Sequence, residues 1–290
     1  MFYGKKMGTR FREYDRHEMV HFGTAREIMS STIISFFWVA FALIILLLMQ
    51  RWIHTHLHGI SLLLMGKPER AVILYAIVLL PGVFLHELSH WLAATFLGVR
   101  TGGFSIIPKM QPDGTVQLGY VEYFKGRTLG PIRESLIGGA PLIMGTAVIL
   151  LIGFRVFSVT QLTAAFQSGQ LEALVIALEQ IFQTPDFLLW LYLLFAIANG
   201  MMPSRSDRRA WPAFLLTMLV AGLVLSLLGW TGVIIDNLAG PAATVFGYLG
   251  LALSMAIGVN LLFMALIAGI EGLVGRAKGV SVVYGQSDSA

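Results

Sequence analysis

Six long apolar runs constrain the fold of this 290-residue chain more than any other feature. A helix that crosses a bilayer needs about 20 mostly apolar residues, because each residue rises about 1.5 Å and the hydrocarbon core is roughly 30 Å thick. Runs of about this length cover residues 31–50, 71–98, 134–154, 186–203, 211–235 and 243–270. We therefore expect an all-α polytopic membrane protein with about six transmembrane helices.

The composition agrees with a membrane setting. Hydrophobic residues make up 56% of the chain and charged residues only 12%, which is typical of a protein that lipid surrounds. The chain contains no cysteine, so disulfide scaffolds, thiolate metal sites and cysteine nucleophiles are excluded. Any metal site must therefore use nitrogen and oxygen ligands.

The 20 lysine and arginine residues indicate how the runs are oriented. Lys and Arg concentrate in the cytoplasmic loops of membrane proteins. With a cytoplasmic N-terminus, all but four of the 20 fall on the cytoplasmic side, the exceptions being Arg51, Lys67, Arg70 and Arg155. We expect a multi-pass protein with both termini in the cytoplasm. The net charge of +4 reflects this asymmetry and gives no reason to expect a nucleic-acid partner.

This topology divides the chain into residues 1–30 as a cytoplasmic N-terminal segment, 31–271 as a six-helix membrane domain and 272–290 as a cytoplasmic tail. Within the membrane domain, residues 101–127 place a Pro-Asp-Gly turn between stretches rich in β-branched and aromatic residues. This pattern predicts a small membrane-associated β-hairpin, with 115–124 as a candidate edge strand. Residues 160–183 have apolar side chains at helical spacing, which predicts an interfacial amphipathic helix.

The second run contains the pentad HELSH, residues 86–90, inside an otherwise apolar stretch. Ionisable groups are costly in hydrocarbon, so an acid and two imidazoles at this depth need partners. Residues four apart share one face of a helix, and His86 and His90 can therefore bind one metal ion. Glu87 lies one residue round from His86, where it could take a proton from a metal-bound water molecule that attacks a carbonyl. The pentad predicts one zinc ion per chain, with Glu87 as general base.

A catalytic zinc site usually has three protein ligands, so a third ligand is expected. The acids considered are Glu122, Glu134, Asp186, Asp207 and Glu271. Asp207 is favoured because it follows NGMMPSRS, where the short fourth run breaks on the same side as the pentad; the alternative is a solvated loop acid paired with nearby arginines. His90 comes ten residues before Arg100, so at about 1.5 Å per residue the site lies about 15 Å from the cytoplasmic end, in the cytoplasmic half of the bilayer.

These residues and their surroundings resemble the site-2 protease family of intramembrane zinc metalloproteases. HELSHWLAATFLGVRTGGFSI resembles the zinc helix and membrane-associated β-hairpin of that family, SLIGGAPLIMGTAVI its small-residue motif, and NGMMPSRSD the segment that supplies an Asp ligand. The resemblance covers about residues 71–210. The chain departs from the family pattern in two places: Pro203 comes four residues after Asn199, and Arg208 directly follows Asp207.

The resemblance implies that His86, His90 and Asp207 are the zinc ligands, that Glu87 is the general base and that Asn199 helps to stabilise the oxyanion. The implied activity is hydrolysis of peptide bonds in or near transmembrane segments. The partners would then be other membrane proteins, as substrates, and the lipid bilayer.

Two other functions fit parts of the sequence. A membrane metalloprotease of the HtpX type would act on peptides or lipidated tails, and it would use a downstream Glu as its third metal ligand. A zinc or proton transporter would hold its cargo with the two histidines near the midplane, but the paired broken helices expected of a transporter are not apparent.

Polar residues outside this site have simpler interpretations. HTHLHG, which contains His54, His56 and His58, is expected to be a solvated interfacial cluster on the outer side, without an acidic partner. Asn260 is expected to link helices by hydrogen bonding, and Glu271 to reach water at the end of the sixth run.

Overall fold

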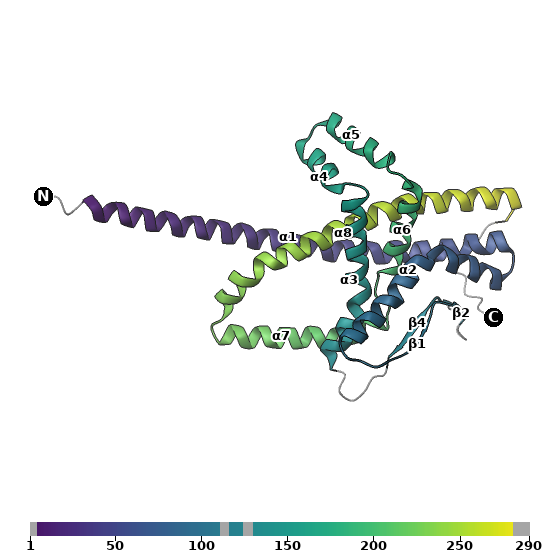
Figure 1. Ribbon diagram of the computed structural model, residues 1–290, viewed down its shortest axis with the longest axis horizontal. Helices are drawn as coiled ribbons and strands as arrows, with labels where there is room; N and C mark the ends of the chain where they lie inside the picture. Colours follow the sequence, from purple (N-terminus) through teal and green to yellow (C-terminus); the bar gives the residue numbers. More distant parts are fainter. Residues whose placement is uncertain (1–4, 111–115, 124–129, 281–290) are drawn as a thin grey trace.

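The computed structural model describes residues 5–110, 116–123 and 130–280, which form eight α-helices, one 3₁₀-helix (η1) and four short strands (Figure 1). In chain order the elements are α1 (Lys5–Met65), α2 (Pro68–Phe96), β1 (Thr101–Ser105), β2 (Lys109–Met110), β3 (Val116–Gln117), β4 (Tyr120–Tyr123), α3 (Pro131–Arg155), α4 (Val159–Ser168), α5 (Leu171–Phe182), α6 (Phe187–Gly200), η1 (Asp207–Ala210), α7 (Trp211–Leu227) and α8 (Thr231–Lys278).

Five of the described helical segments are long and apolar enough to cross a membrane: Thr32–Met65 of α1, α2, α3, η1 with α7, and α8. A sixth results if α5 and α6, which meet at a bend of 92°, are counted as one span. The expectation of a mostly helical polytopic protein is confirmed at this level. The short fourth run is helix α6, and the predicted amphipathic helix is the α4–α5 pair, which projects from the rest of the structure (Figure 1).

Helix α6 is the centre of the packing. Its residues from Leu194 to Asn199 are all buried, because α2, α3 and α8 surround it. Phe195 stacks on Phe263 of α8 with ring centroids 4.0 Å apart. Helices α2 and α6 approach most closely at Gly82 and Gly200, where a Cβ on either residue would overlap the backbone of the other helix. This close approach positions the HELSH turn of α2 beside the end of α6.

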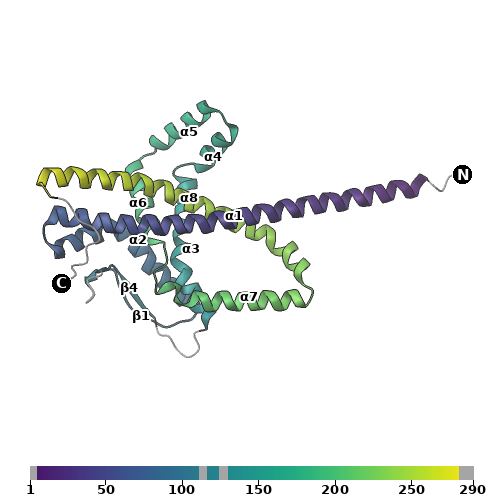
Figure 2. The same cartoon turned by 180° about the vertical axis from the view of Figure 1, so that it is seen from behind.

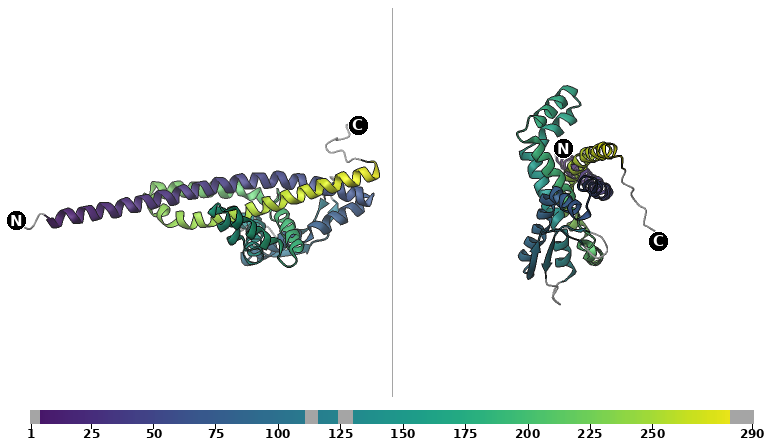
Figure 3. Two further views of the ribbon diagram at one scale, coloured as in Figure 1. Left: turned by 90° about the horizontal axis from the view of Figure 1, so that it is seen from above. Right: turned by 90° about the vertical axis from the view of Figure 1, so that its right-hand side faces the viewer.

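Helices α1 and α8 lie side by side and run in the same direction (Figures 1 and 2). Their contacts advance in the same order along both helices: examples are Trp38 with Ser254, His56 with Glu271, and Leu63 with Lys278. The view from above shows α8 beside the later part of α1, whereas the N-terminal part of α1 extends beyond α8 (Figure 3). The start of α1 and the end of α8 therefore lie at opposite ends of this helix pair.

This parallel arrangement departs from the six alternating crossings expected from the sequence. Six consecutive crossings make the first and last helices antiparallel and put both termini on one side. Here α8 is antiparallel to α6, as the Phe195–Phe263 and Asn199–Asn260 contacts show, even though α7 lies between them in the chain. The structure describes every residue of α7, and none of them is buried. The alternation of directions thus fails at α7, a helix that has no buried residue.

The predicted β-hairpin after α2 is present as two antiparallel strand pairs. Strand β1 pairs with β4, with Phe104 opposite Val121 and an irregularity in register between Thr101 and Phe104. Strand β2 pairs with β3, with Lys109 opposite Gln117. The predicted Pro112-Asp113-Gly114 turn lies outside the described residues. The hairpin follows directly from α2, so its strands return alongside the helix that carries the pentad.

Candidate metal centre

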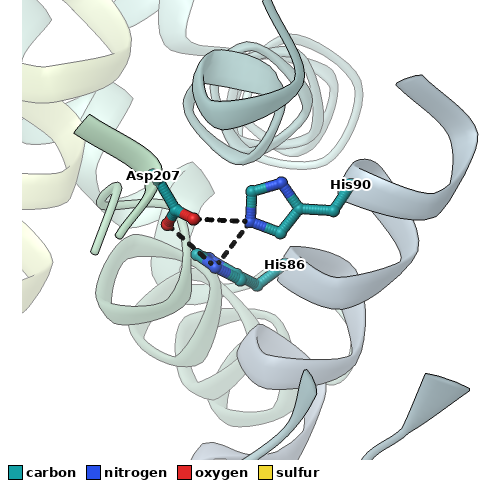
Figure 4. Close-up of side chains that lie close together, drawn as sticks. All are labelled: His86, His90 and Asp207. Atoms are coloured by element: carbon teal, nitrogen blue, oxygen red, sulfur yellow. Dashed lines mark hydrogen bonds and ion pairs between the residues drawn. The ribbon is translucent and has the colours of Figure 1, made fainter. Parts of the chain in front are cut away.

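Three of the predicted site residues come together at one point, although they come from segments far apart in the chain. His86 and His90 project from consecutive turns of α2 toward Asp207 at the start of η1 (Figure 4). The His90 Nε2 atom lies 3.1 Å from His86 Nε2 and 3.3 Å from Asp207 Oδ1, and His86 Nε2 lies 3.5 Å from Asp207 Oδ2. This group of two imidazoles and one carboxylate could hold a metal ion.

The other ring nitrogen of each histidine is bound to a backbone carbonyl. His86 Nδ1 lies 2.7 Å from the oxygen of Gly200, and His90 Nδ1 lies 2.9 Å from the oxygen of Ile137. A carbonyl can only accept a hydrogen bond, so each Nδ1 must carry the proton and each Nε2 must present its lone pair to the centre. Such a bond fixes both the tautomer and the orientation of the ring, as it does in metal sites.

The sequence leaves these two carbonyls available. Ile137 would ordinarily accept a helical hydrogen bond from the residue four positions on, which is Pro141, and proline has no N–H. Gly200 is the last residue of α6, so its carbonyl is among the terminal four that have no partner within the helix. Local backbone rules therefore create an acceptor for each histidine on two different helices.

Asp207 is held by the loop that precedes it and by α3. The backbone N–H of Ser204 donates to Asp207 Oδ2 at 2.7 Å, and the Asp207 N–H donates to Ser204 Oγ at 3.3 Å. Gly138 of α3 lies directly against the backbone of Asp207: a Cβ at Gly138 would be 3.0 Å from the Asp207 carbonyl carbon and closer still to its oxygen. A side chain at position 138 would push Asp207 away from the histidines.

Glu87 lies beside the three converging residues. Only 8% of its surface is exposed, and its carboxylate interacts electrostatically with His86, His90 and Asp207. It also faces the hairpin, because a Cβ at Gly119 would be 2.9 Å from Glu87 Cγ. The structure thus places an acid next to the candidate metal ligands and next to Gly119, which directly precedes β4.

A cavity of about 410 Å³ opens beside this cluster. It is one continuous space that extends from the buried face of α1 to the loop between α6 and η1. Polar side chains line this space at both of its ends. They are Gln50, His54, Tyr75, His86, Glu87, Asn199, Ser204, Arg205 and Arg208. The candidate metal ligand His86 and the candidate base Glu87 therefore share a space with polar groups such as His54 and Tyr75, which the sequence does not connect to them.

Asn199 lines the cavity but its amide hydrogens are engaged elsewhere. Its Nδ2 donates to the Phe195 oxygen at 2.8 Å and to Asn260 Oδ1 at 3.0 Å. An oxyanion needs a hydrogen-bond donor, and both donors of this amide are used. In this arrangement Asn199 links α6 to α8, which confirms the linking role expected of Asn260 and gives no support to an oxyanion role for Asn199.

The histidines of HTHLHG do not form a solvated cluster. They lie within α1, which continues to Met65. His56 Nδ1 is 2.7 Å from Glu271 Oε2, so the expectation that no acid lies nearby was wrong. His54 Nδ1 is hydrogen-bonded to the Tyr75 hydroxyl. The pairing of α1 with α8 and α2, which local sequence patterns do not reveal, creates these contacts.

Among the described residues, the metal-ligating group contains no acid other than Asp207. Glu122, Glu134, Asp186 and Glu271, the other acids considered from the sequence, are not part of it. No protein-family model, curated protein or solved structure matches this chain. The comparisons therefore assign no family, and only the residues of the site bear on its chemistry.

Proposed function

We propose that this chain is a zinc-dependent intramembrane endopeptidase that hydrolyses peptide bonds in or near transmembrane segments of other membrane proteins. The observation that carries the proposal is the convergence of His86, His90 and Asp207 beside Glu87, at the wall of a cavity and within helices long and apolar enough to cross a membrane. The resemblance of the same residues to the site-2 protease family points to the same activity.

The spacing of the three ligand atoms suits zinc. Zinc bonds to histidine nitrogen and carboxylate oxygen are about 2.0–2.2 Å long, so neighbouring ligands of a tetrahedral ion lie roughly 3.3–3.6 Å apart. The two Nε2 atoms here are 3.1 Å apart, and each lies 3.3 or 3.5 Å from one of the two carboxylate oxygens of Asp207. Two neutral imidazoles that present lone pairs, together with one carboxylate, form a ligand set that zinc commonly binds and that leaves a fourth position open.

Zinc, when bound, would polarise a substrate carbonyl and lower the pKa of a water molecule. Glu87 would accept the proton that water loses as its oxygen bonds to the carbonyl carbon, and would later give that proton to the departing amide nitrogen. The C–N bond breaks, and the products are a new carboxylate and a new amine. The carbonyls of Gly200 and Ile137 keep the imidazoles oriented throughout.

The hairpin offers a way to present the substrate. A helical segment must become extended before a protease can cut it, and an extended segment can add to a strand edge through backbone hydrogen bonds. Among the described residues β4 pairs with β1 alone, and the adjacent Leu118 and Gly119 line the cavity beside Glu87. This region falls within residues 115–124, the edge expected from the sequence, of which 115 and 124 lie outside the described residues.

The basic residues near the site favour a cytoplasmic location for it. Arg100 follows α2, Arg133 lies in the first turn of α3, and Arg205, Arg208 and Arg209 lie between α6 and α7. These helix ends all lie on the side of the site, and Arg and Lys concentrate on the cytoplasmic side of membrane proteins. This inference rests on residues around the site and does not depend on the direction of α8.

The direct test combines metal content with cleavage. Detergent-purified wild type should contain about one zinc per chain by elemental analysis and should cleave a model transmembrane substrate. His86→Ala and Asp207→Ala should lose both metal and cleavage, whereas Glu87→Gln should keep the metal and lose cleavage.

Other outcomes would point to other functions. If Asp207→Ala kept zinc and activity while the change of a glutamate abolished both, an HtpX-type ligand set would replace the one proposed. If the chain carried zinc across proteoliposome membranes, and Glu87→Gln carried it as well as wild type did, the chain would be a transporter. Wild type without metal would refute the proposal.

A further inference from the structure

The cavity that contains Glu87 has a second polar end, which the proposed chemistry does not use. This end is formed by His54 on α1 and Tyr75 on α2. Tyr75 is 8% exposed, and its hydroxyl is hydrogen-bonded to His54 Nδ1. His58 packs edge-on against the same tyrosine ring at a centroid distance of 5.8 Å, so aromatic groups of α1 hold Tyr75 in place.

One atom of this pair has no partner. Within the described part of the chain, His54 Nε2 is buried and has no hydrogen-bond partner. Buried polar groups in folded proteins nearly always have one, because an unpaired group gives up its hydration without compensation. His54 is also a wall residue of the cavity. Because this nitrogen belongs to a side chain of the cavity wall, a molecule bound in the cavity is a candidate for the missing partner.

A peptide backbone is the partner that fits either tautomer of His54. If Tyr75 donates its hydroxyl proton to Nδ1, then Nε2 carries a proton and needs an acceptor such as a carbonyl oxygen. If Nδ1 donates to the hydroxyl, then Nε2 needs a donor such as an amide N–H. An extended peptide offers both groups at every residue, and the remaining wall of the cavity includes apolar side chains from Leu47 and Leu79.

We infer that His54 and Tyr75 form a second contact point for the backbone of an extended substrate segment, in addition to the contacts at the scissile bond. This inference rests on the proposed endopeptidase function. Tyr75 and His86 are eleven residues apart on one helix, which corresponds to about 16 Å along its axis. An extended chain advances about 3.3 Å per residue. The contact therefore falls about five residues from the scissile bond.

A backbone ester scan tests this inference on the full-length chain. Replacing a peptide bond by an ester removes the N–H and weakens the carbonyl as an acceptor, so the scan reports on either tautomer. A fluorescent transmembrane peptide carrying one ester at successive positions is titrated against Glu87→Gln chain in nanodiscs, where it binds without being cut. One position about five residues from the scissile bond should lose about five- to tenfold in affinity, the effect of one lost hydrogen bond.

Variants of His54 identify the group responsible. In the same background, His54→Phe should lose the same affinity for the unmodified peptide and become insensitive to the ester at that position. His54→Gln keeps a donor and an acceptor and should recover part of the affinity. His58→Phe, the matched control, contacts the same tyrosine but is not part of the cavity wall, and it should bind as tightly as the parent chain.

The outcomes separate this inference from the proposed function. A flat ester scan, or an ester effect that is equal in the parent and in His54→Phe, would overturn the inference while leaving the endopeptidase proposal in place. If wild-type chain with bound zinc failed to cut the unmodified peptide, the proposed function and this inference would both be refuted. The ester scan requires no change at His54, so it decides the question even if His54→Phe fails to fold.

Discussion

Replacing Gly138 by alanine should weaken metal binding although no ligand is removed. The new Cβ would lie 3.0 Å from the carbonyl carbon of Asp207 and 3.3 Å from its Cα, and closer still to its oxygen. The contact is with backbone, which cannot rotate away as the end of a side chain can. Relief requires Asp207 to move by on the order of 1 Å, whereas metal–ligand distances tolerate about 0.2 Å.

The expected loss of metal affinity is that of a variant in which the residues that position a metal ligand are disturbed. Such changes typically reduce metal affinity by about 10- to 100-fold, or about 1.4–2.8 kcal/mol. The assay is competition for zinc between the purified chain and a chromophoric chelator of known affinity. Asp207→Ala is the reference variant in this assay, because it lacks the third ligand completely.

Gly139→Ala is the matched control for this prediction. Gly139 is the next residue of the same helix, and a Cβ there would meet nothing within 4 Å. The two variants have the same helix propensity and the same added methyl group, so only the contact with Asp207 differs between them. Equal zinc affinity in Gly138→Ala and Gly139→Ala would refute the argument that α3 positions the third ligand.

Three further predictions follow from the packing and the site. Asn199→Ala and Asn260→Ala should each lower the free energy of unfolding by about 1–3 kcal/mol, and the double variant should lose less than the sum, because one buried hydrogen bond joins them; additive losses measured by denaturant unfolding in detergent would contradict this. Gly82→Ala should lower the melting temperature and reduce zinc content, because α2 would be pushed off α6; an unchanged melting curve would contradict the close approach. Chelation should abolish cleavage reversibly and leave the helical circular dichroism unchanged, since apolar contacts form the core; loss of helix on chelation would show that the metal holds the fold together.

The parts of the site that sequence reasoning found are those governed by local periodicity. His86 and His90 share a face because they are four residues apart on a helix. Asp207 was favoured from the break at the end of the fourth run, and the structure brings it to the same point. The hairpin, the short α6 and the linking role of Asn260 also follow from patterns within a few residues.

The parts that sequence reasoning missed depend on which helices are neighbours. Helices that are apolar on all sides do not show which face is buried, so neither the parallel pairing of α1 with α8 nor the partners of His54 and His56 could be predicted. The motif SLIGGAPLIMGTAVI contains both Gly138 and Gly139, and the sequence does not show that Gly138 is the one that contacts Asp207. One signal was available in the sequence: Pro141 frees the carbonyl four residues before it, at Ile137, which then accepts the bond from His90.

The proposed function of this chain is to hydrolyse peptide bonds inside a membrane. The most direct measurement is mass spectrometry of a single-span substrate after incubation with zinc-loaded wild type in proteoliposomes, with Glu87→Gln in parallel. We expect two fragments whose masses add to that of the substrate plus one water, with the cut within or beside the apolar segment, and intact substrate with Glu87→Gln. Intact substrate with zinc-loaded wild type, or the same fragments with Glu87→Gln, would contradict the proposed function.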